Sequence, residues 1–244
     1  MAKKIVLSLA ITLIIAGNAQ GAAQSFEGWS EQEISDWKYK LNVELWRAVE
    51  REGRTEESFQ EPETVQELER ARELERIKER ARVRDLVRKG ANVNMTNFTH
   101  GTPLHRAVYL GRTEMARELL ECGALVDAKT IYEGYTPLFR AVQRGSFPLV
   151  HLLIGAGADV NARAHELQTV LHVAAYHLDL AMVEFFLSKG VNAATVDKKG
   201  RRPIDCVGVV RVDYEGNLAR RERIIALLTA ADGGCQSLQD DQKE

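Results

Sequence analysis

The 244-residue sequence predicts an all-α fold built from copies of one helical pair. A four-residue motif occurs four times, at intervals of 34, 33 and 33 residues. Its copies are TPLH at 102–105, TPLF at 136–139, TVLH at 169–172 and RPID at 202–205. A second motif recurs in phase with the first, around Gly90, Gly123, Gly157 and Gly190. Two motifs locked to one period indicate that a single structural unit is copied along the chain.

Each copy carries the signals of two short helices. Thr and Pro at the start of the motif suit a helix N-terminus, because Thr can cap it and Pro needs no N–H there. Apolar residues follow at helical spacing, as in Leu138, Ala141 and Val142. The glycines of the second motif suit the left-handed turn that ends a second helix.

In its period and its motif the chain resembles the ankyrin repeat, whose signature is T-P-L-H. The resemblance implies an ankyrin-repeat solenoid, in which each repeat has a helix-turn-helix and a hairpin loop. It divides this part of the chain into repeat 2 (95–127), repeat 3 (128–161), repeat 4 (162–194), and repeat 5 with a C-terminal cap (195–231). The polar tail, 232–244, is expected to be disordered.

Two further segments precede these repeats. Residues 24–42 are expected to form an N-terminal capping helix, because Ser30 and Glu33 have capping-box spacing; an aromatic docking helix is the alternative. Residues 43–94 resemble a degenerate first repeat with a charged helical insertion at 54–76. No Gly or Pro occurs from Glu63 to Lys89, which predicts one long helix. This helix is interpreted as solvated, with a partner-binding or dimerising coiled coil as the alternative.

Residues 1–23 have the pattern of a secretory signal peptide. Lys3 and Lys4 precede an apolar run from Ile5 to Gly17, and small residues follow it. The run is short for a membrane span, although an uncleaved anchor is the alternative. We therefore expect export to the periplasm, or secretion, because the compact signal resembles bacterial ones. No stable membrane insertion is expected after cleavage.

Charge and cysteine content exclude several classes of protein. The formal net charge of −2 does not favour a nucleic-acid binder. Three cysteines, Cys122, Cys206 and Cys235, are an odd number and do not form a disulfide framework. A bridge between Cys206 and Cys235 is left open.

The sequence indicates a protein that is not an enzyme. It has no nucleophile elbow, metalloprotease helix, phosphate-binding loop or dinucleotide fingerprint. His105 and His172 stand in the motif position where the family uses imidazole as a structural brace, and we assign them that role. We expect no catalytic residue, cofactor or metal site.

Two surfaces are the candidate partner-binding sites, because ankyrin arrays usually bind proteins through their concave groove and hairpin tips. The tip residues are Phe98, His100, Ile131, Tyr132, His165 and Leu167. The groove residues are Arg106, Tyr109, Leu110, Arg140, Gln143, Arg144, Tyr176 and His177. Tyr and Arg are enriched in interface hot spots, and Arg140 and Arg144 suit an acidic partner. Sideways packing of Tyr109 and Tyr176 is the alternative.

The resulting hypothesis is an exported ankyrin-repeat protein that mediates protein–protein interaction. One role is that of an immunity or inhibitor protein for a toxin or enzyme acting in the envelope. The alternatives are an accessory protein that stabilises a periplasmic enzyme and an effector that binds host proteins. The oligomeric state is left open.

Overall fold

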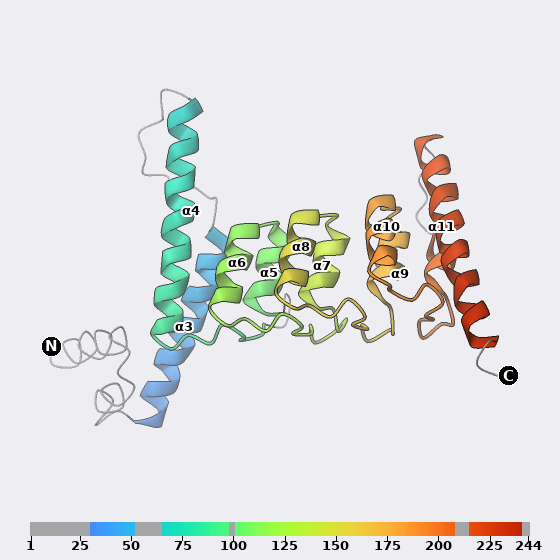
Figure 1. Ribbon diagram of the computed structural model, residues 1–244. Helices are drawn as coiled ribbons and strands as arrows, with labels where there is room; N and C mark the ends of the chain where they lie inside the picture. The colour runs from blue at the N-terminus through green and yellow to red at the C-terminus, as the bar shows by residue number, and fades with distance from the viewer. Residues whose placement is uncertain (1–29, 52–64, 98–100, 208–214, 241–244) are drawn as a thin grey trace. The chain divides into compact units, whose positions relative to one another are not determined.

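The computed structural model describes residues 30–51, 65–97, 101–207 and 215–240. Within these ranges the chain forms α-helices and one short 3-10 helix, and no β-strand (Figure 1). It divides into two compact units. Unit 1 holds the described residues up to Asn97 together with 102–107 and 114–124. Unit 2 holds Gly101, residues 108–113 and the described residues from Leu125 onward.

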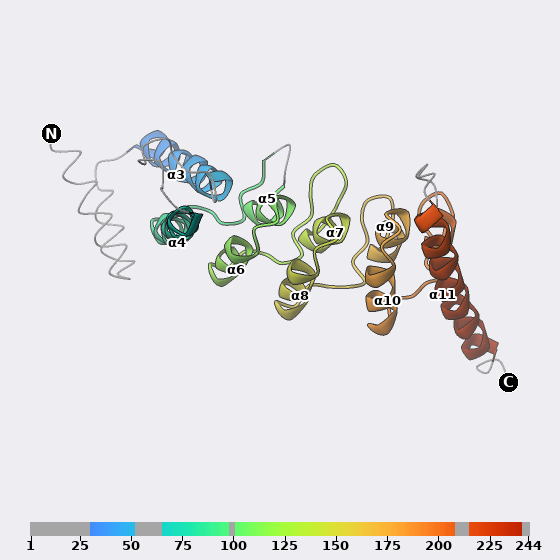
Figure 2. The ribbon, with the colours of Figure 1, turned by 90° about the horizontal axis from the view of Figure 1, so that it is seen from above.

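Unit 1 is built around the packing of α3 (Glu31–Arg51) against α4 (Val65–Arg88) (Figure 2). The predicted capping box starts α3: the Glu33 N–H donates to Ser30 Oγ over 3.2 Å, and the Ser30 N–H donates to Glu33 Oε2 over 3.0 Å. The buried apolar residues of the two helices are Leu41, Leu45, Ala48, Val49, Val83 and Leu86. Their burial ties the start of the described chain to the long helix.

The N-terminal part of unit 1 differs from the expected arrangement. A capping helix was expected to end at residue 42 and a repeat to begin at residue 43, but α3 runs without interruption across this boundary. The physical reason is that no Gly or Pro occurs between Glu31 and Arg51, so nothing in the sequence ends the helix there. The long helix expected from Glu63 to Lys89 is present as α4.

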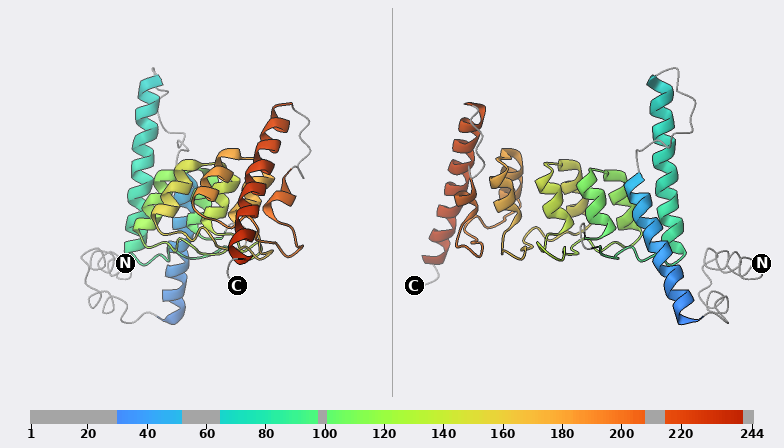
Figure 3. Two further views of the ribbon diagram at one scale, coloured as in Figure 1. Left: turned by 45° about the vertical axis from the view of Figure 1, so that its right-hand side comes forward. Right: turned by 180° about the vertical axis from the view of Figure 1, so that it is seen from behind.

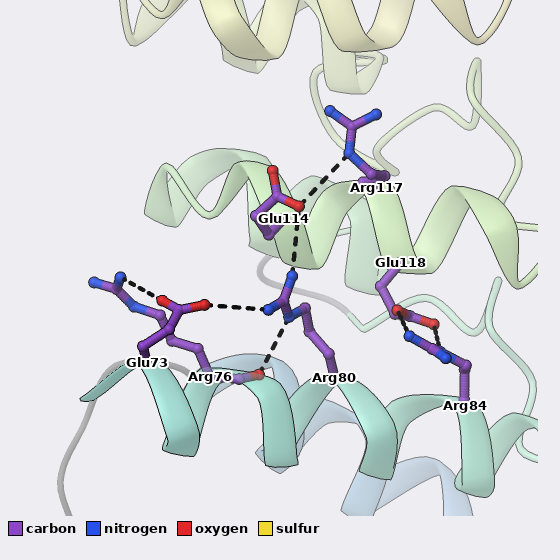
Figure 4. Close-up of polar contacts among 7 residues, drawn as sticks. All are labelled: Glu73, Arg76, Arg80, Arg84, Glu114, Arg117 and Glu118. Atoms are coloured by element: carbon purple, nitrogen blue, oxygen red, sulfur yellow. Dashed lines mark hydrogen bonds and ion pairs between the residues drawn. The ribbon is translucent and has the colours of Figure 1, made fainter. Parts of the chain in front are cut away.

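Charged side chains join α4 to α6 (Thr113–Glu121). Figure 4 shows Arg80 facing Glu114, with 3.4 Å between Nη1 and Oε2, and Arg84 facing Glu118 in a two-pronged contact. Glu118 is buried, so this pair is a fixed part of unit 1 rather than a loose surface contact. The helix α4 has 24 residues and α6 has nine, and α4 extends well past α6 (Figure 3).

Unit 2 contains two complete helical pairs and a terminal element. The first pair is α7 (Pro137–Gln143) and α8 (Phe147–Gly155); the second is α9 (Val170–Tyr176) and α10 (Leu180–Ser188). The last element is η1 (Pro203–Cys206) followed by α11 (Glu215–Asp240). First helices α7 and α9 pack on each other, each packs on its own second helix, and α11 packs on α10. The helix α5 (Pro103–Leu110) contributes residues to both units.

The core of unit 2 consists of the apolar residues that the repeat pattern predicted. Leu138, Leu153, Leu171, Met182 and Phe186 have no exposed surface. Gly123 in unit 1, and Gly157 and Gly190 in unit 2, follow second helices with φ of 87°, 91° and 76°, the left-handed conformation expected of them.

The C-terminal helix is longer than predicted. A helix ending at Ala231 and a disordered tail from residue 232 were expected, whereas α11 continues to Asp240. The segment has no Pro to break the helix, and once a helix exists each added residue gains one backbone hydrogen bond. Of the cysteines, Cys122 and Cys206 carry free thiols.

Several predictions concern residues outside the described ranges. These are the signal peptide at 1–23, the first part of the insertion, Phe98 and His100. Among the helices that are described, none is long and apolar enough to cross a membrane.

Candidate functional site

The Thr-x-x-His motif forms a buried brace at the start of two first helices. The Thr102 hydroxyl lies 2.8 Å from His105 Nδ1, and the Thr169 hydroxyl lies 2.9 Å from His172 Nδ1. The Thr169 N–H donates to the same His172 nitrogen over 3.1 Å, so Nε2 carries the proton and donates to the carbonyl of Arg201 over 3.0 Å. This confirms the structural role predicted for both histidines.

His172 is also unsuited to acid–base or metal chemistry. Burial lowers the pKa of His172 below its usual value, although the hydrogen bond to the Arg201 carbonyl acts in the opposite direction. Both ring nitrogens already have partners within the protein. Across the described ranges, no three His, Cys, Asp or Glu side chains are grouped closely enough to hold a metal ion.

The third repeat replaces this brace with an aromatic stack. Phe139 stands where the other copies have histidine, and its ring stacks on Tyr135 with centroids 5.2 Å apart. The prediction that Thr136 caps the helix is wrong, because its side chain makes no capping hydrogen bond and its buried hydroxyl has no partner. Without an imidazole, nothing at this position can accept the hydroxyl proton.

Arg140 connects a hairpin tip to the end of the first helix. Its guanidinium donates to Gln143 Oε1 over 3.0 Å and to Glu133 Oε1 over 3.3 Å, and lies 5.1 Å from the centroid of the Tyr135 ring. Its side chain is only 19% exposed. The chain's own Glu133 therefore already supplies an acidic partner to Arg140, which was expected to suit an acidic side chain of another molecule.

Arg144 is held differently, with its charge exposed. Its Nη1 donates to the carbonyl of Tyr109 over 2.8 Å. The guanidinium crosses Gly111, where a Cβ atom would lie 2.4 Å from Arg144 Nε, so only glycine fits this approach. Among the described residues no carboxylate pairs with Arg144, whose side chain is exposed.

Two exposed tyrosines accompany Arg144 in unit 2. Tyr109 is 57% exposed and Tyr176 is 43% exposed, so neither is packed away from solvent. The Tyr176 ring meets the exposed His177 ring edge-on, with centroids 5.3 Å apart. Leu110 is half-buried beside Tyr109.

The hairpin tips of unit 2 are linked to one another. The His165 N–H donates to the carbonyl of Glu133 over 2.9 Å, and His165 Nδ1 lies 3.0 Å from the carbonyl of Tyr132. On the next tip, the Lys198 N–H donates to the carbonyl of Glu166 over 2.9 Å. The tips nevertheless expose apolar side chains: Ile131, Tyr132, Leu167 and Val196.

Residues 78–164 match the family model described as ankyrin repeats (3 copies), and residues 143–187 match the model described as ankyrin repeats (many copies). Residues 78–187 of the chain are thus recognised as ankyrin repeats. With the all-helical structure, these matches confirm the predicted fold class, the ankyrin-repeat solenoid. Ankyrin repeats bind protein partners and are generally not enzymes. The first match begins within α4, which agrees with the use of its C-terminal part in the first repeat.

The ankyrin register explains which site predictions come together. Tyr109, Gln143 and Tyr176 occupy equivalent positions at the ends of successive first helices, and all three belong to unit 2. Arg106 does not join them: it belongs to unit 1, where its Nη2 lies 3.4 Å from Glu50 Oε1. The sequence argument missed Val196, which is 45% exposed and could have been found because it immediately precedes a loop equivalent to the tips already chosen.

Proposed function

We propose that unit 2 binds an acidic segment of a partner protein through one surface, which we call the tyrosine–arginine surface. It comprises Tyr109, Leu110, Ile131, Tyr132, Gln143, Arg144, His165, Leu167, Tyr176 and His177. The observation that carries the proposal is Arg144, an exposed cation fixed on the Tyr109 carbonyl between two exposed tyrosines. Ankyrin repeats bind proteins, and these exposed side chains support this surface as the site and an acidic segment as its partner.

The chemistry of Arg144 favours a carboxylate. One side of the guanidinium is held by the Tyr109 carbonyl, and the remaining donors can grip a carboxylate in two parallel hydrogen bonds. Because the side chain is already ordered, binding a partner costs less conformational entropy than it would for a mobile arginine. Tyr109 and Tyr176 supply rigid aromatic contact on either side, as hot-spot residues do.

The hairpin tips extend the same surface. Arg140 bonds both Glu133 at a tip and Gln143 at a helix end, so tip and helix end form one continuous face. Exposed apolar side chains on ordered loops are typical of interaction sites. Of the apolar tip side chains that the structure describes, Tyr132 has the largest exposed fraction, 70%.

For the biological role we propose an exported immunity or inhibitor protein that blocks a toxin or enzyme in the envelope. The charged start and apolar run of residues 1–23 support export. An accessory protein that stabilises a periplasmic enzyme, and an effector that binds host proteins, are the alternatives. Loss of the partner's activity on binding supports inhibition, preserved or raised activity supports the accessory role, and recovery of the protein from host cytosol supports the effector role.

Affinity capture with a double variant tests the surface. Tyr109→Ala with Arg144→Glu removes an aromatic contact and reverses the central charge, so captured partners should be lost. Tyr39→Ala with Arg221→Glu is the matched control, because it changes the same residue types at exposed positions outside the tyrosine–arginine surface. Equal recovery of the same partners by both variants would show that the wrong surface has been assigned.

A further inference from the structure

The outward face of α8 and α10 is uncharged over most of its length. No Asp, Glu, Lys or Arg occurs in the fourteen residues from Gly145 to Ala158, which include all of α8. In unit 1 the corresponding helix α6 exposes Glu114, Arg117 and Glu121. A largely apolar helix is typical of one that is covered, yet Pro148, His151 and Gly155 of α8 are exposed in unit 2.

The flank of α10 that faces α8 is aromatic and basic. The Phe185 ring meets the rings of Phe147 and His151 edge-on, with centroids 5.9 Å and 5.1 Å apart. Lys189 Nζ lies 5.5 Å from the centroid of the Phe185 ring. His151 and Lys189 are exposed, and Phe147 and Phe185 are half-buried. This flank is therefore a ridge of rings with a cation at one end.

The opposite flank of α10, which faces α11, is hollow and mainly acidic. A cavity of about 460 Å³ opens there. Its lining residues are His177, Leu178, Asp179, Leu180, Ala181, Glu184 and Arg220. Two carboxylates against one guanidinium give the rim a negative balance, while the leucines and the alanine provide an apolar floor. The two flanks of α10 are thus complementary in charge and in shape.

We propose that this face binds a second copy of the chain, through a two-fold axis parallel to α10. Such an axis exchanges the flanks, so the ridge of each copy faces the hollow of the other. The strip between the flanks is formed by the exposed Ala181 and Ser188 and the half-buried Phe185. Alanine and serine are small enough for the two helices to approach closely along it.

The spacing of the flanking charges fits this axis. Glu184 and Lys189 are five residues apart, which on a helix places them about 140° from each other, on either side of the strip. In parallel helix pairs these are the positions that form salt bridges between helices. Glu184 of each copy therefore meets Lys189 of the other. Both halves of the complementarity lie on one chain, which is why a second copy, rather than a different protein, is the occupant.

The oligomeric state and a charge swap test the proposal. The protein is purified as it accumulates in the cell, without further truncation. Sedimentation velocity should then show dimers whose fraction rises with protein concentration. Glu184→Lys or Lys189→Glu alone should weaken association by roughly tenfold or more, because like charges then face each other. The double variant should restore it, and Glu222→Lys, at an exposed position on α11 that is not among the cavity-lining residues, should change nothing.

A cross-linking variant tests the same geometry without relying on charge. Ser188→Cys lies on the strip that faces its own copy across the axis, so mild oxidation should give a covalent dimer more readily than Glu222→Cys does. A chain that stays monomeric at every concentration overturns the proposal. The proposal is also overturned if neither single charge change weakens dimer association, or if the double variant does not restore it. Of the tyrosine–arginine surface only His177 also lines this cavity, so capture of a partner by monomers leaves the proposed function standing.

Discussion

Repeats 3 and 4 begin with equivalent copies of one motif, but different interactions stabilise the two copies. In repeat 4, Thr169 and His172 form a buried polar bridge that continues to the carbonyl of Arg201. In repeat 3, Phe139 stacks on Tyr135 and leaves the Thr136 hydroxyl without a partner. One backbone thus accepts either a hydrogen-bonded or an aromatic brace, provided that the apolar residues behind it are kept.

The two repeats also differ in their turns. Repeat 3 uses Gly134 and Gly145 where the chain needs positive φ, whereas repeat 4 has Leu167 and Leu178 at the equivalent positions, with φ of 57° and 55°. A side chain in this conformation is strained. Repeat 4 therefore has the better brace and the costlier turns, and repeat 3 has the reverse.

The largest expected effect tests what the two repeats share. Leu138 and Leu171 have no exposed surface, and each packs in the same position of its repeat. Truncation of either to Ala should lower the free energy of unfolding by about 2–5 kcal/mol, because it removes buried methyl groups and leaves a cavity. Denaturant unfolding measures this loss. A cost below that of Tyr132→Ala, a change at an exposed tip, would contradict the shared core.

A second prediction converts the brace of repeat 4 into that of repeat 3. His172→Phe removes the hydrogen bonds to Thr169 and Arg201, and should lower the free energy of unfolding by about 1–3 kcal/mol, since buried polar groups lose their partner. The reverse change, Phe139→His, offers Thr136 an acceptor but loses the stack on Tyr135. It should cost less than His172→Phe does.

The pH dependence of the unfolding free energy gives a further test of the His172 brace. Burial lowers the pKa of His172 in the folded protein, so the unfolded chain takes up this proton first as pH falls. The stability that neutral His172 contributes is complete above the unfolded pKa of about 6.5 and is lost as pH falls from there toward the lower folded pKa. His172→Phe should flatten this part of the stability profile, measured as unfolding free energy between neutral and mildly acidic pH. An unchanged slope would mean that His172 is not held neutral by the fold.

Sequence reasoning recovered the parts of the molecule that repeat and missed those decided by contacts between repeats. Period and motif were enough for the helical pairs, the buried leucines and the histidine braces. They could not show that Glu133 forms an ion pair with Arg140, because the fold of the loop against its own helix brings the two groups together. Nor could they show that the Tyr109 carbonyl fixes Arg144, a contact made across two repeats and opened by Gly111. The end of α3 was misplaced because a repeat boundary need not be a helix boundary.

The smallest expected effect concerns the strained turn of repeat 4. Leu167→Gly relieves a left-handed conformation that costs a non-glycine residue about 1–2 kcal/mol, but adds about 0.5–1 kcal/mol of backbone entropy to the unfolded chain. The net result should be a gain in unfolding free energy of about 0.5 kcal/mol, measured by denaturant unfolding. Gly134→Leu is the opposing variant and should destabilise strongly, because a Cβ there would lie 2.3 Å from His165 Cδ2. If Leu167→Gly gains stability and yet weakens partner binding, the strain is retained for the exposed leucine that contacts the partner. If it loses stability, Leu167 packs into its tip more firmly than its 39% exposure indicates.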